Sequence, residues 1–171
     1  MDIHLCSKFE VLQLAPKVGA THLLSLLDPN EAGPAPDRID AARTLRIACH
    51  DLSEPTARYL APSADHARAI VDFARKLPDD ASLVVHCHAG VSRSPAAVIL
   101  CIAATSPSFD AASSRVRAFF EAQRFIRPNP LLVRHGDEIL GLQGRLVRLV
   151  QDLQGEQLIR SDAEKTSLIL L

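Results

Sequence analysis

The sequence predicts an α/β fold, with a central, mostly parallel sheet flanked by helices and a helical C-terminal half. Short apolar segments bounded by turn residues alternate with segments whose apolar residues recur at helical spacing, and this alternation is typical of β-α-β units. After residue 105 only the helical pattern continues. The chain has 171 residues, of which 47% are hydrophobic and 23% charged. It is therefore long enough for one globular domain with its own core.

Four apolar segments followed by turn or loop residues are the predicted strands. They cover 3–6, 21–27, 44–49 and 82–86. Helical spacing predicts four helices. They cover 63–77, 94–105, 110–124 and 129–153, and Arg127-Pro128-Asn129-Pro130 separates the last two. We assign 1–153 to a single domain and 154–171 to a C-terminal tail, whose apolar end is a candidate for packing on the domain or on a second subunit.

Composition and charge exclude several classes of protein. The formal net charge of −1 gives no global basic field, so neither nucleic acid nor an anionic membrane is an implied partner. The N-terminus lacks the pattern of a secretory signal, and the longest apolar runs are too short to span a bilayer. Four cysteines, at 6, 49, 87 and 101, are too few for a disulfide framework in a chain of this size. We expect a cytoplasmic protein with reduced thiols, in which Cys49 and Cys101 are inert core residues; the oligomeric state stays open.

The segment from Cys87 to Arg93 is the most informative in the sequence. A cysteine six positions before an arginine is weak evidence alone, but here an apolar strand leads directly into the cysteine and a helix begins directly after the arginine, with Pro95 in its first turn. Gly90 allows a positive φ or a close backbone approach. The backbone N–H groups of the loop and the helix N-terminus can then converge on one anion. The predicted phosphate-binding residues are His88, Ala89, Gly90, Val91, Ser92 and Arg93.

The side chains in and around this loop can each be given a chemical role. Cys87 lies at the base of the predicted cradle, where amides, helix dipole and Arg93 favour the thiolate, which is the nucleophilic form. The planar fork of Arg93 matches two phosphate oxygens, which lysine cannot do. Ser94 can place its hydroxyl near the sulfur and ease the departure of sulfur in a second step. His86 is better interpreted as a group that orients the backbone of Cys87 than as a base.

The stretch His86-Cys87-His88-Ala89-Gly90-Val91-Ser92-Arg93-Ser94 resembles the signature loop of the protein tyrosine phosphatase superfamily, and is most similar to that of compact, bacterial dual-specificity-like members. The resemblance is strong over 83–97 and looser over 44–142. It implies that 1–153 is a phosphatase catalytic domain with the α/β sandwich of that superfamily. Arg127-Pro128-Asn129 is similar to the stretch in which an asparagine supports the phosphate loop, so the resemblance assigns a supporting role to Asn129.

The resemblance also implies a general acid, an aspartate that precedes the cysteine in the chain. In a parallel sheet, the loops that follow neighbouring strands meet at one edge. Asp51 follows the predicted strand 44–49 and meets this condition. We therefore predict Asp51 as the acid. Asp65 and Glu54 stay open as alternatives, because the loop between 50 and 62 can fold either way.

These assignments predict a cysteine-dependent phosphatase that hydrolyses phosphate monoesters through a cysteinyl-phosphate intermediate. Phosphotyrosine on proteins is the first expectation, and phosphoserine or phosphothreonine the second. The alternatives are a phosphoinositide or other small-molecule phosphatase, and a phosphoprotein-binding module with weak turnover. The loop positions 88–92 contain no lysine, which argues against a multiply phosphorylated inositol ring. Beyond His86-x-His88, a weak signal, the histidines show no metal-ligand spacing, so we expect no metal and no cofactor.

Overall fold

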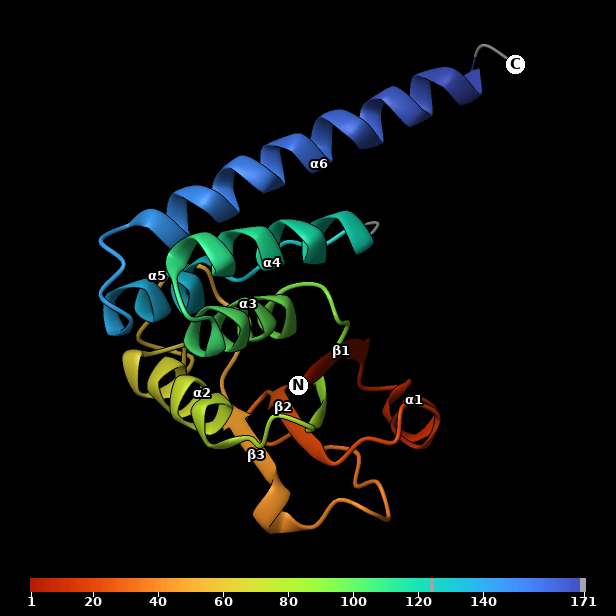
Figure 1. Cartoon of the computed structure of the whole chain (residues 1–171), viewed down its shortest axis with the longest axis vertical. Helices are drawn as coiled ribbons and strands as arrows, with labels where there is room; N and C mark the ends of the chain where they lie inside the picture. Colours follow the sequence, from red (N-terminus) through yellow and green to blue (C-terminus); the bar gives the residue numbers. More distant parts are fainter. Residues whose placement is uncertain (124, 170–171) are drawn as a thin grey trace.

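A four-stranded parallel sheet forms the centre of the fold (Figure 1). The computed structural model describes residues 1–123 and 125–169, with side chains as far as residue 159. The strands are β1 (Asp2–Ser7), β2 (His22–Leu27), β3 (Thr44–Ala48) and β4 (Ser82–Cys87), in the order β1-β4-β2-β3. All three strand pairs are parallel, so the carboxyl ends of the strands lie at one edge of the sheet. The predicted α/β fold is confirmed.

Helices cover both faces of the sheet, one face far more heavily than the other (Figure 1). Helix α1 (Val11–Lys17) packs on one face against β1 and β4. The other helices are α2 (Ala64–Lys76), α3 (Arg93–Thr105), α4 (Phe109–Ala122), α5 (Pro130–Ile139) and α6 (Arg145–Ile169), and a 3-10 turn, η1 (Ala41–Arg43), precedes β3. Helices α2 and α3 pack on the second face, α5 packs on both of them, and α4 packs on α3. Helix α6 lies against α4 and α5. Over the described residues only helices follow β4, so the C-terminal half is helical as predicted.

The alternation of side chains along β4 divides the core in two. Leu83, Val85 and Cys87 belong to the larger core, which α2 to α6 cover, while Val84 belongs to the smaller core under α1. His86 points to the same side as Val84, because successive side chains of a strand alternate. Cys87, the last residue of β4, therefore enters the following loop from the α3 side of the sheet.

Helix α3 begins directly after that loop and runs through the larger core. All of its residues from Arg93 to Ile102 are buried, which explains why this helix is apolar on every side. Pro95 lies in its first turn, where the missing N–H removes no hydrogen bond. Helix α2 begins at a capping box between Ser63 and His66, as the helical pattern from residue 63 predicts.

The single helix expected over 129–153 is wrong, because the structure has two helices, α5 and α6, in that region. Gly141 and Gly144 between them have positive φ angles of 67° and 81°, which a continuing α-helix does not allow. The buried carboxylate of Asp137 accepts hydrogen bonds from the N–H groups of Gly144 (2.6 Å) and Leu146 (2.7 Å). It thereby caps the start of α6 and fixes the turn.

Helix α1 was not predicted. It has only 7 residues and contains Pro16, and proline is a signal against a helix interior. Its buried residues, Val11 and Ala15, are four positions apart, which is the short helical pattern that identifies it.

The boundary between domain and tail at residue 153 stays a prediction. Helix α6 runs through this position. Gln157, which is buried, binds the backbone N–H of Ile126 and the carbonyl of Gln123, so the start of the predicted tail packs on the domain. The side chains from 160 onward, including the apolar end of the tail, lie outside the described residues. Within the described part of the chain, no helix is long and apolar enough to cross a bilayer.

Candidate active site

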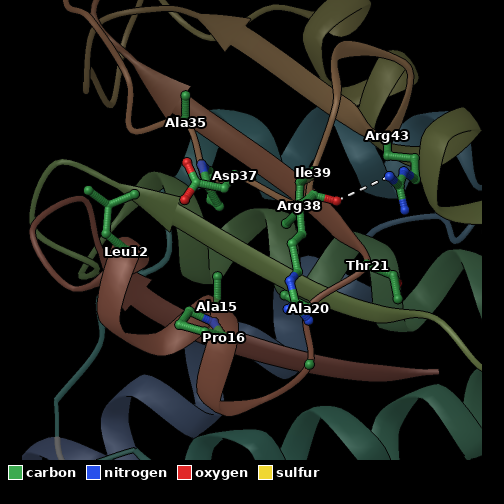
Figure 2. Close-up of a pocket in the computed structure, with 12 residues that line it drawn as sticks. Leu12, Ala15, Pro16, Ala20, Thr21, Ala35, Asp37, Arg38, Ile39 and Arg43 are labelled. Carbon is green, nitrogen blue, oxygen red and sulfur yellow. Dashed lines mark hydrogen bonds between the residues drawn. The ribbon is translucent and has the colours of Figure 1, made fainter.

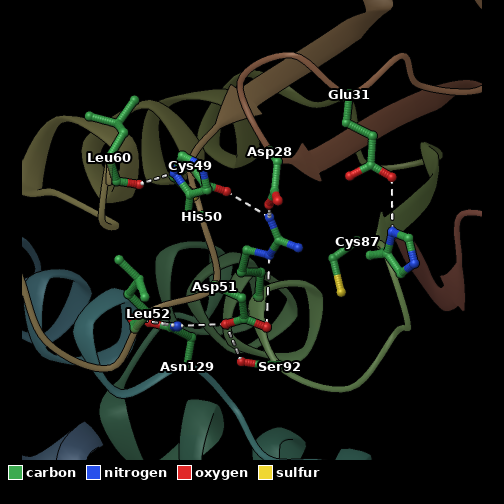
Figure 3. Close-up of polar contacts among 12 residues, drawn as sticks. Asp28, Glu31, Cys49, His50, Asp51, Leu52, Leu60, Cys87, Ser92 and Asn129 are labelled. Carbon is green, nitrogen blue, oxygen red and sulfur yellow. Dashed lines mark hydrogen bonds and ion pairs between the residues drawn. The ribbon is translucent and has the colours of Figure 1, made fainter. Parts of the chain in front are cut away.

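Cys87 lies at the base of the loop that joins β4 to α3 (Figure 3). Its side chain is buried, and two donors reach its sulfur. The Ser94 hydroxyl donates to Sγ over 3.0 Å, and the Gly90 N–H donates over 3.3 Å. Both donors, together with the N-terminus of α3, stabilise negative charge on the sulfur. The arrangement therefore suits a nucleophilic sulfur at this position.

The backbone of the loop offers unpaired donors. Over the residues that the structure describes, the N–H groups of His88, Ala89, Val91 and Ser92 have no hydrogen-bond acceptor in the protein. Backbone N–H groups in folded proteins are nearly always paired, so a run of free ones is suited to an anion. Gly90 makes this loop possible: its φ is 77°, and a Cβ there would lie 3.0 Å from the carbonyl of Cys6.

The guanidinium of Arg93 is held at one nitrogen and free at another. Its Nη1 donates to the Asp28 carboxylate over 2.7 Å and to the Cys49 carbonyl over 2.6 Å. Nε is buried and has no hydrogen-bond partner among the described residues. The nearest carboxylate, that of Asp51, lies 3.8 Å from it, which is an ion-pair distance but too long for a hydrogen bond. A buried, unpaired donor is costly, so this edge of Arg93 is suited to a bound anion.

Asp51 lies against the same loop (Figure 3). Its Oδ1 accepts hydrogen bonds from the Ser92 hydroxyl (2.7 Å) and from the Asn129 amide (2.9 Å), and its Oδ2 faces Arg93. These contacts fix the carboxyl group beside the predicted phosphate site. Glu54 and Asp65, the two alternatives, are exposed, and neither has a hydrogen bond or ion pair to the loop in the described structure. The geometry favours Asp51, whose role as acid stays a prediction.

Asn129 connects three segments around the site. Its Oδ1 accepts from the N–H groups of Leu131 and Leu132 and so caps α5. Its Nδ2 donates to Asp51 and to the Leu52 carbonyl (3.0 Å), and its backbone N–H donates to the Ser92 carbonyl (3.1 Å). These contacts join the segment of Asp51 to the end of the Cys87 loop; the supporting role of Asn129 stays a prediction.

His86 is fully buried behind Cys87. Its Nδ1 lies 3.3 Å from the Cys87 carbonyl, and because that oxygen can only accept, Nδ1 carries the proton. Burial lowers the pKa of His86 to about 4, so the ring is neutral at neutral pH. It can orient the Cys87 backbone, as predicted for it, but does not face the substrate side of the loop.

The other three cysteines have different surroundings. Burial raises the pKa of Cys49 to about 11 and the pKa of Cys6 and Cys101 to about 12. All four cysteines are free. At neutral pH these three are protonated thiols, which is what the interpretation of Cys49 and Cys101 as inert core residues requires.

Two acidic residues at the rim of the site were not identified from the sequence. Asp28 contacts Arg93, and Glu31 binds the His88 ring (2.9 Å) and the Lys8 ammonium. Burial alone would raise the pKa of Glu31, but the hydrogen bonds from Lys8 and His88 outweigh it, and the pKa falls to about 2. The His88 side chain therefore points to the rim, and only its backbone can line the anion site. Asp28 directly follows a predicted strand, which is the signal that could have identified it.

A cavity lies away from these residues. It has a volume of about 550 Å³ and lies between α1 and the segment 35–43 (Figure 2). None of the residues predicted for the site lines it. In the described part of the chain, no group of three or more His, Cys, Asp or Glu side chains is placed to hold a metal ion.

Comparison with known proteins identifies the fold. No protein-family model and no curated protein matches the sequence, but solved structures do. DUSP15 matches with a TM-score of 0.58 and 19% identity, over 90% of both chains. The chain has the fold of the dual-specificity phosphatases. The human tyrosine phosphatase-like serine/threonine/tyrosine-interacting protein matches with a TM-score of 0.60 and 23% identity, over 82% of this chain and 92% of that one.

The same fold occurs in PTPMT1, solved in complex with PI(5)P, with a TM-score of 0.53 and 16% identity over 94% of both chains. These similarities cover 82% to 94% of the chain, whereas the sequence resemblance is strong only around the Cys87 loop. The resemblance to the protein tyrosine phosphatase superfamily is thus confirmed for the fold.

Proposed function

We propose that this protein is a cysteine-dependent phosphatase that hydrolyses phosphate monoesters. One observation carries the proposal: the Cys87 sulfur, a run of unpaired backbone N–H groups and the open edge of Arg93 meet in a single loop. Nucleophilic attack on a phosphate group requires a nucleophile, donors that bind the phosphate oxygens and a cation that stabilises their charge, and this loop contains all three.

The first step forms the cysteinyl phosphate. The Cys87 thiolate attacks phosphorus, the S–P bond forms, and the bond between phosphorus and the ester oxygen breaks. Asp51 donates a proton to that oxygen, so the alcohol or phenol leaves as a neutral molecule. Arg93 and the loop N–H groups stabilise the charge on the other phosphate oxygens.

The second step releases phosphate. Water attacks phosphorus, Asp51, now a carboxylate, accepts a proton from the water, and the S–P bond breaks. Sulfur leaves as the thiolate, which accepts hydrogen bonds from Ser94 and Gly90. Inorganic phosphate and the free enzyme result.

Phosphorylated proteins, phosphotyrosine first, are the substrates we propose. Exposed aromatic rings flank the loop: Phe9, which is 70% exposed, contacts His88, and Tyr59, which is 44% exposed, contacts His50 beside Asp51. Such rings suit an aromatic leaving group. A phosphoinositide remains the small-molecule alternative. We also propose a reducing, cytoplasmic setting, in which the four free thiols stay reduced.

The direct test is to trap the intermediate. Acid quenching during the turnover of 4-nitrophenyl phosphate, followed by digestion and mass spectrometry, is expected to find phosphate on the peptide that contains Cys87. A phosphate group on a different residue, or no adduct despite turnover, would overturn the mechanism.

An Asp51→Asn protein is expected to lose kcat/KM, which reports the first step, in proportion to the difficulty of the leaving group. For phenyl phosphate we expect a loss of about 10²-fold, and for 4-nitrophenyl phosphate a smaller one, because nitrophenolate needs little protonation. The matched controls are Glu54→Gln and Asp65→Asn, each of which should show the same ratio of kcat/KM between the two substrates as the unmodified protein. A uniform loss in Asp51→Asn would remove Asp51 as the acid.

A further inference from the structure

We propose that Asp28 is a positioning residue for Arg93, which holds the guanidinium so that its Nε edge faces the phosphate site. The inference rests on the proposed phosphatase function and assigns a residue that the sequence pattern did not indicate. Figure 3 shows Asp28 and Asp51 joined to the same guanidinium.

The position of Asp28 follows from the order of the strands. It comes directly after Leu27, the last residue of β2, and β2 pairs with β4, the strand that leads into Cys87. Because all strands are parallel, the end of β2 lies at the edge of the sheet where the Cys87 loop begins. Asp51 follows β3, which is separated from β4 by β2. Asp28 therefore belongs to the nearer strand.

The contacts of Arg93 show what Asp28 does. Nη1 has two protons, and Asp28 (2.7 Å) and the Cys49 carbonyl (2.6 Å) accept them. Because a guanidinium is planar, two hydrogen bonds at one nitrogen fix the orientation of the whole group. Nε stays without a partner, and the donors that remain can bind two oxygens of one anion.

Asp28 differs from Asp51 in how it meets Arg93. The Asp28 contact is a hydrogen bond, while Asp51 lies 3.8 Å from Nε, on the edge that the anion would use. A bound phosphate would thus replace the Asp51 contact and leave the Asp28 contact in place. Asp28 is 47% exposed at its side chain and Arg93 only 5%, so the carboxylate partly offsets the cost of the buried cation.

The experiment measures oxyanion binding as well as turnover. In Asp28→Asn and Asp28→Ala proteins, we expect tungstate to bind about tenfold more weakly and kcat/KM to fall about tenfold, because a charge-assisted contact that is half-exposed is lost. Both losses should be smaller for Asn than for Ala. The loss should be equal for phenyl phosphate and 4-nitrophenyl phosphate, since Asp28 does not transfer the proton. In an Arg93→Lys background, Asp28→Asn should change tungstate binding no further, because the planar group that it orients is absent.

The matched control is Asp37→Asn, which removes an exposed carboxylate from the same connection between β2 and β3; it should leave both measurements unchanged. A loss that grows with the difficulty of the leaving group would make Asp28 an acid instead of a positioning residue. The proposal would also be overturned if Asp28→Asn weakened tungstate binding as much in the Arg93→Lys background as in the unmodified protein, or if it weakened binding in neither. Tungstate binding without turnover in the unmodified protein would contradict the proposed function and leave the inference on Asp28 intact.

Discussion

A Cys87→Ser protein is expected to fold normally and to lose turnover of 4-nitrophenyl phosphate by a factor on the order of 10⁴ or more. Serine has the shape of cysteine, and its oxygen can accept the hydrogen bonds that Ser94 and Gly90 donate to the sulfur. A hydroxyl stays protonated at neutral pH, so the nucleophile is lost while the anion site is kept. Steady-state phosphate release measures the loss, and tungstate binding verifies that the site is intact.

Cys101→Ser is the matched control for that substitution. Cys101 is buried in α3, and burial raises the pKa of its thiol to about 12. A serine there can donate to a carbonyl one turn earlier in the helix, so kcat should stay within a few fold of the unmodified value. Turnover that survives in Cys87→Ser, or that falls equally in Cys101→Ser, would refute the assignment of the nucleophile.

The loop could be predicted from sequence because its signals are local. A strand, Cys87, Gly90, Arg93 and a helix follow one another within a few residues, and each constrains the conformation of the next. The φ of 77° at Gly90 and the Ser94 contact with sulfur agree with what the residue types alone indicate. In such a segment the residues that determine the geometry are adjacent in the sequence, so the sequence pattern is sufficient to predict that geometry.

Asp28 could not be found in this way, because its role depends on the order of the strands. The rule that led to Asp51 was the shared edge of a parallel sheet, applied to β3 as the neighbour of β4. In the structure β2 lies between them. The Asp28-Pro29-Asn30 sequence is also good turn chemistry, and this local explanation concealed the contact with Arg93, which is 65 positions away.

The break between α5 and α6 was missed for a related reason. Apolar residues on both sides of it keep a helical spacing, so the pattern alone indicates one helix. The break depends on Gly141 and Gly144 together with Asp137, whose buried carboxylate accepts from the backbone beyond the turn. A single glycine is compatible with a helix, whereas two glycines with a capping carboxylate are not.

Arg93→Lys is the substitution with the second largest expected effect, a fall in kcat/KM of about 10³-fold. Lysine keeps the positive charge at this buried position, so the protein should remain folded. It has no Nε edge, however, and cannot bind two phosphate oxygens in one plane. We therefore expect tungstate affinity to fall together with kcat/KM, since the lost contacts serve the bound oxyanion and the transition state alike.

The control for charge and size is Arg75→Lys, at an exposed position in the last turn of α2, which should leave both quantities unchanged. If Arg93→Lys kept kcat/KM within a few fold, a point charge would be sufficient at this position, and the planar geometry would not matter. The two hydrogen bonds at Nη1 and the unpaired Nε argue against that outcome, because a point charge would need neither. The orientation of Arg93, and not its charge alone, is therefore the property that the surrounding residues maintain.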